Sequence, residues 1–211
     1  MNKKKVLLRP LQAEDREQFI LDNQEAFRYG ALEEFGCRDT HFEEDGEIIS
    51  RDTIGKSIDT GEAYRIICDG QIAGGAVVRI DGEKGDLELL FVSPSVHSKG
   101  IGYAAWQEIE AMYPQVKEWE TITPYFEKRN IHFYVNRCGF QIVEFFNKHH
   151  YPQNAPETEM LICVVQKHQV VAMEKIIAAH PGAFAYSTVI NETLGNYEKI
   201  RYNVFDHLKK K

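Results

Sequence analysis

The sequence predicts an α+β fold built on an antiparallel meander, and two observations predict it. Three strand-like segments follow one another in the middle of the chain, and Asp69-Gly70 joins the first to the second. Such a dipeptide between apolar runs is a strong hairpin signal, and Asp81-Gly82 ends the second segment in the same way. Segments with helical apolar periodicity precede and follow this meander.

The N-terminal part of the chain predicts one strand and one helix. The strand covers Val6–Arg9, and the helix follows Pro10 over about Ala13–Phe27, where apolar residues recur at heptad-like spacing. In residues 29–61, Asp and Glu interrupt short apolar pieces, so we expect loops there with a short helix near Ile48–Ile58.

The later elements are expected in regular alternation. They are strands at Ala63–Cys68, Ile72–Ile80 and Leu87–Val92, a helix from Ile101, a strand at Trp119–Ile122, a helix at Arg129–Cys138, and strands at Gln141–Phe146 and Met160–Gln166. Pro114 ends the first of these helices, and Gly139 is a natural stop for the second. Beyond Lys167, residues 170–180 and 197–208 have helical spacing and residues 184–190 are strand-like.

Composition narrows the class of protein. The chain has 211 residues, 43% of them hydrophobic, which suits one domain or a domain with an appendage. A net charge of −7 argues against a nucleic-acid-binding surface. No run approaches the roughly 20 apolar residues of a membrane span, and the N-terminus lacks the apolar core of a signal peptide. The four cysteines are scattered singly, without a CxxC pair, so we expect a soluble cytoplasmic protein without zinc module or disulfide framework.

A glycine pair marks the junction between a predicted strand and helix. In FVSPSVHSKGIGYAAW, which begins at Phe91, Gly100 and Gly102 precede the helical pattern. Without side chains there, backbone N–H groups of the first helical turn can approach an anion such as a pyrophosphate. The alternative is a plain strand-to-helix turn that needs positive φ. A Walker A motif and a Rossmann fingerprint are both absent, the latter because Ala105 stands where its third glycine belongs.

Two stretches carry a resemblance to a known family. LFVSPSVHSKGIGYAAW resembles the acyl-CoA motif of the GNAT superfamily of N-acetyltransferases, in which a strand ending V-x-P leads to Q/R-x-x-G-x-G/A. NIHFYVNRCGFQIVEFF resembles the family's FYxxxGF segment, and the element order over about three quarters of the chain is similar to the family fold. The resemblance implies a mixed, mostly antiparallel central sheet flanked by helices in an α/β three-layer arrangement. Residues 1–166 would form this GNAT-like acetyltransferase domain, with residues 167–211 as a C-terminal extension.

The resemblance also implies where acetyl-CoA binds. Backbone amides of residues 97–102 would hold its pyrophosphate, and the strand end at Phe91 and Val92 would receive the pantetheine and the acetyl oxygen. The implied cosubstrate-binding residues are Phe91, Val92, His97, Ser98, Lys99, Gly100, Ile101, Gly102 and Tyr103. The sequence departs from the motif at His97, where Gln or Arg is usual, and at Ser98, where Gly is common. Because the contacts are chiefly to backbone, binding is expected to persist.

Tyr134 matches the tyrosine of FYxxxGF, which the family commonly places near the CoA sulfur as general acid. The resemblance implies that role here. Periodicity alone gives another interpretation, because Ile131, Tyr134, Val135 and Cys138 fall on one helical face and would make Tyr134 a core aromatic.

Two carboxylates are candidates for the general base. Asp86 aligns with the strand position where some family members carry a catalytic glutamate, and Glu88 lies two residues on, hence on the same face of a strand. The alternative is that Asp86 ends the turn after Gly85, while Glu88 faces solvent or pairs with Arg79 across the hairpin.

The resemblance implies an acetyl-CoA-dependent N-acetyltransferase that transfers the acetyl group to a primary amine of a small acceptor by direct attack. The acids and aromatics of residues 29–61 could suit a cationic amine, although such a charge run is more often a solvated face. No metal site is expected, since His132 and the pair His149-His150 lack partners at ligand spacing.

Two other interpretations stay open. One is a non-catalytic acyl-CoA-binding or interaction module with the same fold, in which His97, Ser98 and Glu127 mark decay of the site. Glu127 replaces an asparagine often found upstream of the FY segment. The other is that the tail from Lys167 exchanges between subunits and explains a homodimer.

Overall fold

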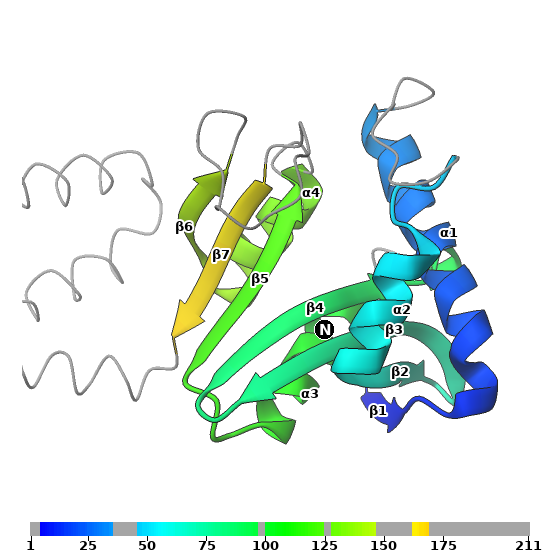
Figure 1. Ribbon diagram of the computed structural model, residues 1–211, viewed down its shortest axis with the longest axis horizontal. Helices are drawn as coiled ribbons and strands as arrows, with labels where there is room; N and C mark the ends of the chain where they lie inside the picture. Colours follow the sequence, from blue (N-terminus) through cyan, green and yellow to red (C-terminus); the bar gives the residue numbers. More distant parts are fainter. Residues whose placement is uncertain (1–4, 36–45, 97–99, 125–127, 147–161, 169–211) are drawn as a thin grey trace, which may run out of the picture. The chain divides into compact units, whose positions relative to one another are not determined.

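The structure, a computed structural model of the 211-residue chain, describes residues 5–35, 46–96, 100–124, 128–146 and 162–168 (Figure 1). Its elements are β1 (Val6–Pro10), η1 (Ala13–Asp15), α1 (Arg16–Phe35), α2 (Arg51–Thr60), β2 (Glu62–Cys68), β3 (Gln71–Asp81), β4 (Lys84–Val92), η3 (Pro94–Val96), α3 (Ile101–Met112), β5 (Glu118–Pro124), α4 (Lys128–His132), η4 (Phe133–Cys138), β6 (Gln141–Phe146) and β7 (Ile162–His168).

Seven strands form one mixed sheet in the order β1-β2-β3-β4-β5-β7-β6. Neighbouring strands pair antiparallel except β4 and β5, which are parallel, so the predicted mixed and mostly antiparallel sheet is confirmed. Asp69 and Gly70 turn β2 into β3 with φ of 53° and 78°. Positive φ at both positions is what a two-residue type I′ hairpin turn requires.

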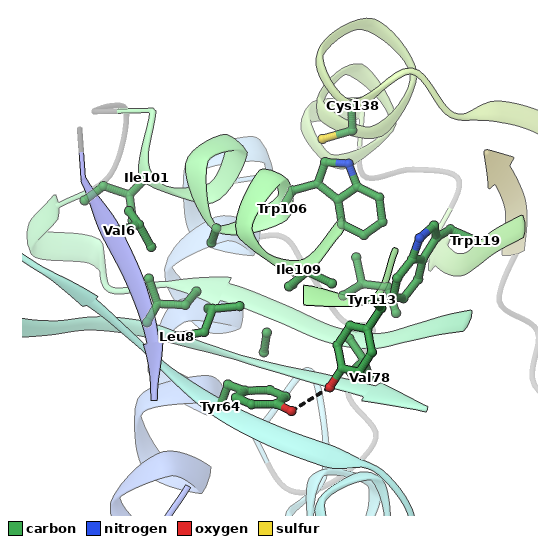
Figure 2. Close-up of a cluster of buried hydrophobic side chains, with 14 of the residues drawn as sticks. Val6, Leu8, Tyr64, Val78, Ile101, Trp106, Ile109, Tyr113, Trp119 and Cys138 are labelled. Carbon is green, nitrogen blue, oxygen red and sulfur yellow. Dashed lines mark hydrogen bonds between the residues drawn. The ribbon is translucent and has the colours of Figure 1, made fainter. Parts of the chain in front are cut away.

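Helices cover both faces of the sheet (Figure 1). On one face, called the α1/α2 face below, Phe19 and Ile54 pack against Val77 and Phe91. On the other, called the α3 face, a larger core contains Ile101, Trp106, Ile109, Tyr113, Trp119 and Cys138 (Figure 2). The amphipathic spacing of α3 produces this core, because its buried residues recur on one side of the helix.

The parallel contact between β4 and β5 is short. It consists of three residue pairs, Lys84 with Glu118, Gly85 with Trp119 and Asp86 with Glu120. Beyond these pairs the two strands diverge, as Figure 1 shows from their shared lower end. A Cβ atom on Gly85 would lie 2.6 Å from the Trp119 ring. The close packing at the point where the two strands begin to separate, called the base of the split below, therefore requires glycine.

A bulge in β4 lies immediately past this contact, at Glu88. Leu87 pairs with Val78 and Leu89 pairs with Val77, so three residues of β4 oppose two of β3. Leu87 consequently packs in the α3-face core, whereas Leu89 packs in the α1/α2-face core. In a regular strand, residues two apart would share a face, so the bulge turns the end of β4.

A buried arginine ties α1 to the sheet. Arg65 on β2 is fully buried, and its guanidinium donates to Asp15 at 2.7 and 3.0 Å and to Asp22 at 2.6 Å. It also lies over the Phe19 ring, 5.1 Å from the centroid. The two hydrogen bonds from Arg65 hold the pKa of Asp15 below its usual value. This charge is buried only because both carboxylates meet it.

Two predicted boundaries were wrong, and one predicted helix has the expected extent but changes type along its length. The first long helix runs to Phe35 rather than ending near Phe27, so the start of the expected loop segment is helical. Its acids were read as loop signals, although Ala, Leu and Glu are good helix formers. β4 begins at Lys84, three residues before the expected start, because the short parallel contact with β5 lies there. The helix expected over residues 129–138 is α-helical only to His132 and π-helical beyond.

The proposed division into residues 1–166 and 167–211 stays a prediction. Almost all of the extension, including its predicted helices and strand, lies outside the described residues, as do residues 36–45 and the loop around His149.

We predict that Asp15→Asn lowers the free energy of unfolding by about 3 kcal/mol at pH 7, because the buried Arg65 loses the carboxylate to which it donates two hydrogen bonds. Since the folded-state pKa of Asp15 is lowered, this contribution is complete above the unfolded pKa near 3.8 and is lost as the pH falls below it. Urea unfolding at pH 7 and near pH 3 measures both effects. The control is Asp59→Asn, which removes the exposed pair with Arg16 and should cost less than about 1 kcal/mol. Equal decreases in the free energy of unfolding of the two variants would contradict the conclusion that the buried Arg65 pair stabilises the fold more than an exposed pair does.

Candidate functional site

The divergence of β4 and β5 opens a cleft of about 480 Å³ between them. Its wall includes five consecutive β4 residues, 88–92, and three β5 residues, 121–123. Other lining residues come from α1 (Ala26, Phe27, Gly30), from the start of α3 (Gly100, Ile101, Gly102, Tyr103), and from α4 and η4 (Arg129, Asn130, His132, Phe133, Tyr134, Arg137). Because α1 covers one face of the sheet and α3 the other, the cleft connects the two faces.

The start of α3 forms one end of the cleft. Gly100 caps the helix with φ of 76° and has no side chain to bond the first-turn amides, and the amide of Ala104 bonds back to the Gly100 carbonyl at 3.1 Å. The amides before it have no acceptor within the helix. The sequence alternative of a turn with positive φ therefore applies to Gly100.

Gly102 needs another explanation, because it lies inside the helix and its φ is not positive. A Cβ there would meet Phe133 and Val92 at an ordinary contact distance of 3.6 Å. Packing within the protein does not require glycine at this position. Its missing side chain instead leaves room for a ligand beside the positive end of the helix dipole, which fits an anionic group.

The predicted cosubstrate-binding residues fall into two groups. Phe91, Val92, Gly100, Ile101, Gly102 and Tyr103 all line the cleft. His97, Ser98 and Lys99 lie outside the described residues.

The β5 side of the split contributes two threonines to the wall of the cleft. Thr121 is the first β5 residue past the last pair with β4, and its hydroxyl donates to the carbonyl of Leu87 at 2.8 Å. This bond takes the place of a backbone ladder bond where the strands separate. Thr123, two residues on, also lines the cleft.

Tyr134 is buried in the core and also lines the cleft, and its role as general acid stays a prediction. It is only 9% exposed and packs against the rings of Phe133 and Phe140, with centroids 5.3 and 5.6 Å away, and it also lines the cleft. It sits in the π-helical segment, where the amide of Gly139 bonds to its carbonyl. Single π-helical turns occur often at functional sites.

The two candidate carboxylates occupy different places. Among the described residues lining the cleft, Glu88 is the only carboxylate, and Asp86 lies at the closed base of the split. Arg79 on β3 binds both, at 2.7 Å to Asp86 and 3.0 Å to Glu88. The expected pairing of Glu88 with Arg79 is thus present, and the hydrogen bond to Asp86 raises the pKa of the guanidinium. The Ser57 hydroxyl of α2 reaches the other Glu88 oxygen at 3.5 Å, which places this carboxylate on the α1/α2 face.

Other reactive groups do not form a second centre in the described part of the chain. Cys138 is buried, and desolvation raises the pKa of its thiol to about 12, so it stays protonated near neutral pH. His132 bonds to Asn136 at 2.8 Å. Among the described residues, no group of His, Cys, Asp and Glu is arranged to hold a metal ion. No helix in these ranges is long and apolar enough to cross a membrane.

Sequence reasoning missed three features of this site. The sequence predicted the contact of Arg79 with Glu88 but not its contact with Asp86. It also did not predict the bulge in β4 or the two threonines that line the cleft. The alternation of Trp119, Thr121 and Thr123 on one face of a strand was the available signal for the threonines. The predicted acids of residues 33–44 have no described side chains, so the acidic acceptor pocket stays a prediction.

Comparison with known proteins gives a consistent result. Residues 25–140 match the model of the acetyltransferase (GNAT) family. The uncharacterized protein YrkN of Bacillus subtilis (strain 168) is 49% identical over 154 residues, which are 71% of this chain and 80% of YrkN. A GNAT family acetyltransferase from Elizabethkingia anophelis, solved with acetyl-CoA bound, has a TM-score of 0.55 at 16% identity and covers 79% of this chain and 100% of its own. The PaiA N-acetyltransferase from Thermoplasma acidophilum in complex with coenzyme A also has a TM-score of 0.55 at 16% identity, covering 78% and 99%. At these identities the two structures demonstrate the shared fold.

Proposed function

The chain belongs to the GNAT acetyltransferase family, and from this premise we propose that it is an N-acetyltransferase that moves an acetyl group from acetyl-CoA to a primary amine of a small acceptor. The observation that carries the proposal is the cleft between β4 and β5, which connects the two faces of the sheet. A donor and an acceptor entering from opposite faces would meet between the two strands.

The α3 face suits acetyl-CoA as cosubstrate. The start of α3 offers the amide donors of its first turn and the positive end of the helix dipole to a pyrophosphate, and Gly102 leaves space beside them. Related structures hold acetyl-CoA or coenzyme A, which supports this assignment. When bound, acetyl-CoA supplies a thioester whose carbonyl is open to attack and whose thiolate can leave.

The α1/α2 face suits the acceptor amine. Ala26, Phe27 and Leu89 give this side an apolar wall, and Glu88 adds a carboxylate. In the proposed reaction Glu88 takes a proton from the amine, directly or through water, as its nitrogen bonds to the acetyl carbon. Tyr134 gives a proton to the sulfur as the carbon–sulfur bond breaks. The two groups thereby remove one proton and supply one.

Between the two carboxylates, placement favours Glu88 as base. Asp86 lies where β4 and β5 still pair and reaches Arg79 through both Nε, at 3.1 Å, and a terminal nitrogen. We assign Asp86 to anchoring Arg79, which in turn orients Glu88 through the 3.0 Å contact. A base held by an arginine is well positioned but less basic, so the amine must displace part of this contact.

The same ion pair favours the alternative of a non-catalytic acyl-CoA-binding module, because a carboxylate held permanently by Arg79 would not accept a proton. A test for turnover distinguishes the enzyme from the non-catalytic module. Release of CoA in the presence of an amine panel supports the enzyme, and tight binding without turnover supports the module. The homodimer and the cytoplasmic location remain predictions.

We predict that Gly102→Ala weakens acetyl-CoA binding at least tenfold while the protein becomes no less stable. Alanine is the better helix former by about 0.5–1 kcal/mol, and its methyl group meets no close contact from the protein. Calorimetric titration and thermal unfolding measure the two effects. Gly30→Ala is the matched control, because Gly30 is also helical and lines the cleft from α1 with nothing within 4 Å of its Cβ position. Unchanged acetyl-CoA affinity in Gly102→Ala would contradict binding at the start of α3.

Glu88→Gln should lower kcat by about 10²–10⁴-fold, the range for loss of a general base, with acetyl-CoA affinity little changed. Steady-state kinetics with CoA release as readout measures this. Asp86→Asn is the paired variant and should cost less than Glu88→Gln, because it acts only through Arg79. A larger loss in Asp86→Asn would transfer the base role to Asp86.

Tyr134→Phe should lower kcat more than it changes acetyl-CoA affinity, since the hydroxyl acts only as the sulfur departs. The ring packing against Phe133 and Phe140 is retained in this variant. Equal losses in kcat and in affinity would count against Tyr134 as general acid.

A further inference from the structure

Thr121 and Thr123 are the same residue type on the same strand, but they differ in the hydrogen bonding of their hydroxyl groups. Both lie on β5, both are almost fully buried, at 4% and 2% exposed, and both line the cleft. The Thr121 hydroxyl donates to the Leu87 carbonyl at 2.8 Å. The Thr123 hydroxyl oxygen is buried without a hydrogen-bond partner among the described residues.

The divergence of the strands explains the difference. Asp86 and Glu120 form the last pair between β4 and β5, and Thr121 is the next residue, still close enough to bond across the split. Thr123 lies about 7 Å farther along the strand. The cleft separates the strands at that level, so no carbonyl of β4 takes the place that Leu87 fills for Thr121.

A buried hydroxyl without a partner has a cost that a valine of the same shape would avoid. Most such groups in folded proteins have partners, so this exception among the described residues, in the wall of a ligand cleft, suits a hydrogen bond to a bound ligand. Threonine exchanges its hydroxyl and methyl positions by rotation about χ1 between staggered rotamers, so Thr123 can present its hydroxyl to the cleft.

The face on which Thr123 lies identifies the partner. Trp119, Thr121 and Thr123 are spaced by two along β5 and share one side of the strand. Trp119 packs in the α3-face core with Tyr134 and Ile101. Thr123 therefore lies on the α3 face of the sheet, where acetyl-CoA is proposed to bind. Glu88 and the proposed acceptor site lie on the α1/α2 face.

We propose that Thr123 is a cosubstrate-binding residue whose hydroxyl donates a hydrogen bond to a carbonyl oxygen of the acyl-pantetheine arm of acetyl-CoA. This inference rests on the proposed function, since it needs acetyl-CoA in the cleft. The arm offers amide and thioester carbonyls as acceptors, which match a hydroxyl donor. Thr121 holds the split together, whereas Thr123 binds what enters it.

The test compares Thr123→Val with Thr123→Ser and Thr121→Val, using two probes in calorimetric titrations. Acetyl-CoA contains the arm, and adenosine 3′,5′-bisphosphate lacks it. Thr123→Val should weaken acetyl-CoA binding about five- to tenfold and leave the bisphosphate affinity unchanged, while Thr123→Ser retains wild-type affinity for both. Without ligand, Thr123→Val should unfold at the same temperature as the wild type or a higher one. Thr121→Val should unfold at a lower temperature, because the Leu87 carbonyl loses its partner.

The outcomes distinguish a failure of the role of Thr123 from a failure of the proposed function. Unchanged acetyl-CoA affinity in Thr123→Val, or an equal loss for both probes, would overturn the role of Thr123 while leaving the proposed function intact. A lower unfolding temperature for ligand-free Thr123→Val would reveal a structural role for the hydroxyl and would also overturn the inference. Failure of the wild-type protein to bind acetyl-CoA would instead overturn the proposed function, and the role of Thr123 with it.

Discussion

The candidate site depends on how short the parallel contact between β4 and β5 is. Three residue pairs hold the strands together, with Trp119 packed on Gly85 at the base of the split. A longer ladder would satisfy the backbone groups of both strands and close the sheet. Stopping it at Asp86 leaves one edge of β4 open along the cleft. The bulge at Glu88 acts at the same point, because it turns the residues that follow and places Leu89 on the α1/α2 face.

Two arginines on neighbouring strands organise the charge of the α1/α2 face in different ways. Arg65 is fully buried and is met by two carboxylates, so its role is to fix α1 on the sheet. Arg79 is half exposed and also contacts two carboxylates, but one of them lines the cleft. Burial makes the first arrangement permanent, because a lost partner would leave an uncompensated charge. Exposure to water makes the second exchangeable, which is what a carboxylate needs if it is to receive a proton.

The sequence was sufficient to predict most of the fold but only part of the site. Hairpin dipeptides and alternating apolar residues determine the β2–β3–β4 meander locally. β2 and β3 were predicted to within one residue at each end, whereas the start of β4 was not. The glycines at the start of α3 were found because their spacing is itself a signal. The bulge could not be predicted, since it depends on the register between strands, and no single-strand pattern records it. The contact of Arg79 with Asp86 and the exceptional position of Thr123 could not be predicted for the same reason, because each depends on the neighbouring strand.

The central claim is that the open edge of β4 and the start of α3 form an acetyl-CoA site. Calorimetric titration of the wild-type protein with acetyl-CoA tests it most directly, because binding does not require knowledge of the acceptor amine. We expect saturable one-to-one binding in the micromolar range, within the usual span for enzyme substrates. Absence of binding at millimolar acetyl-CoA would contradict it and would leave a family fold that does not use this cosubstrate.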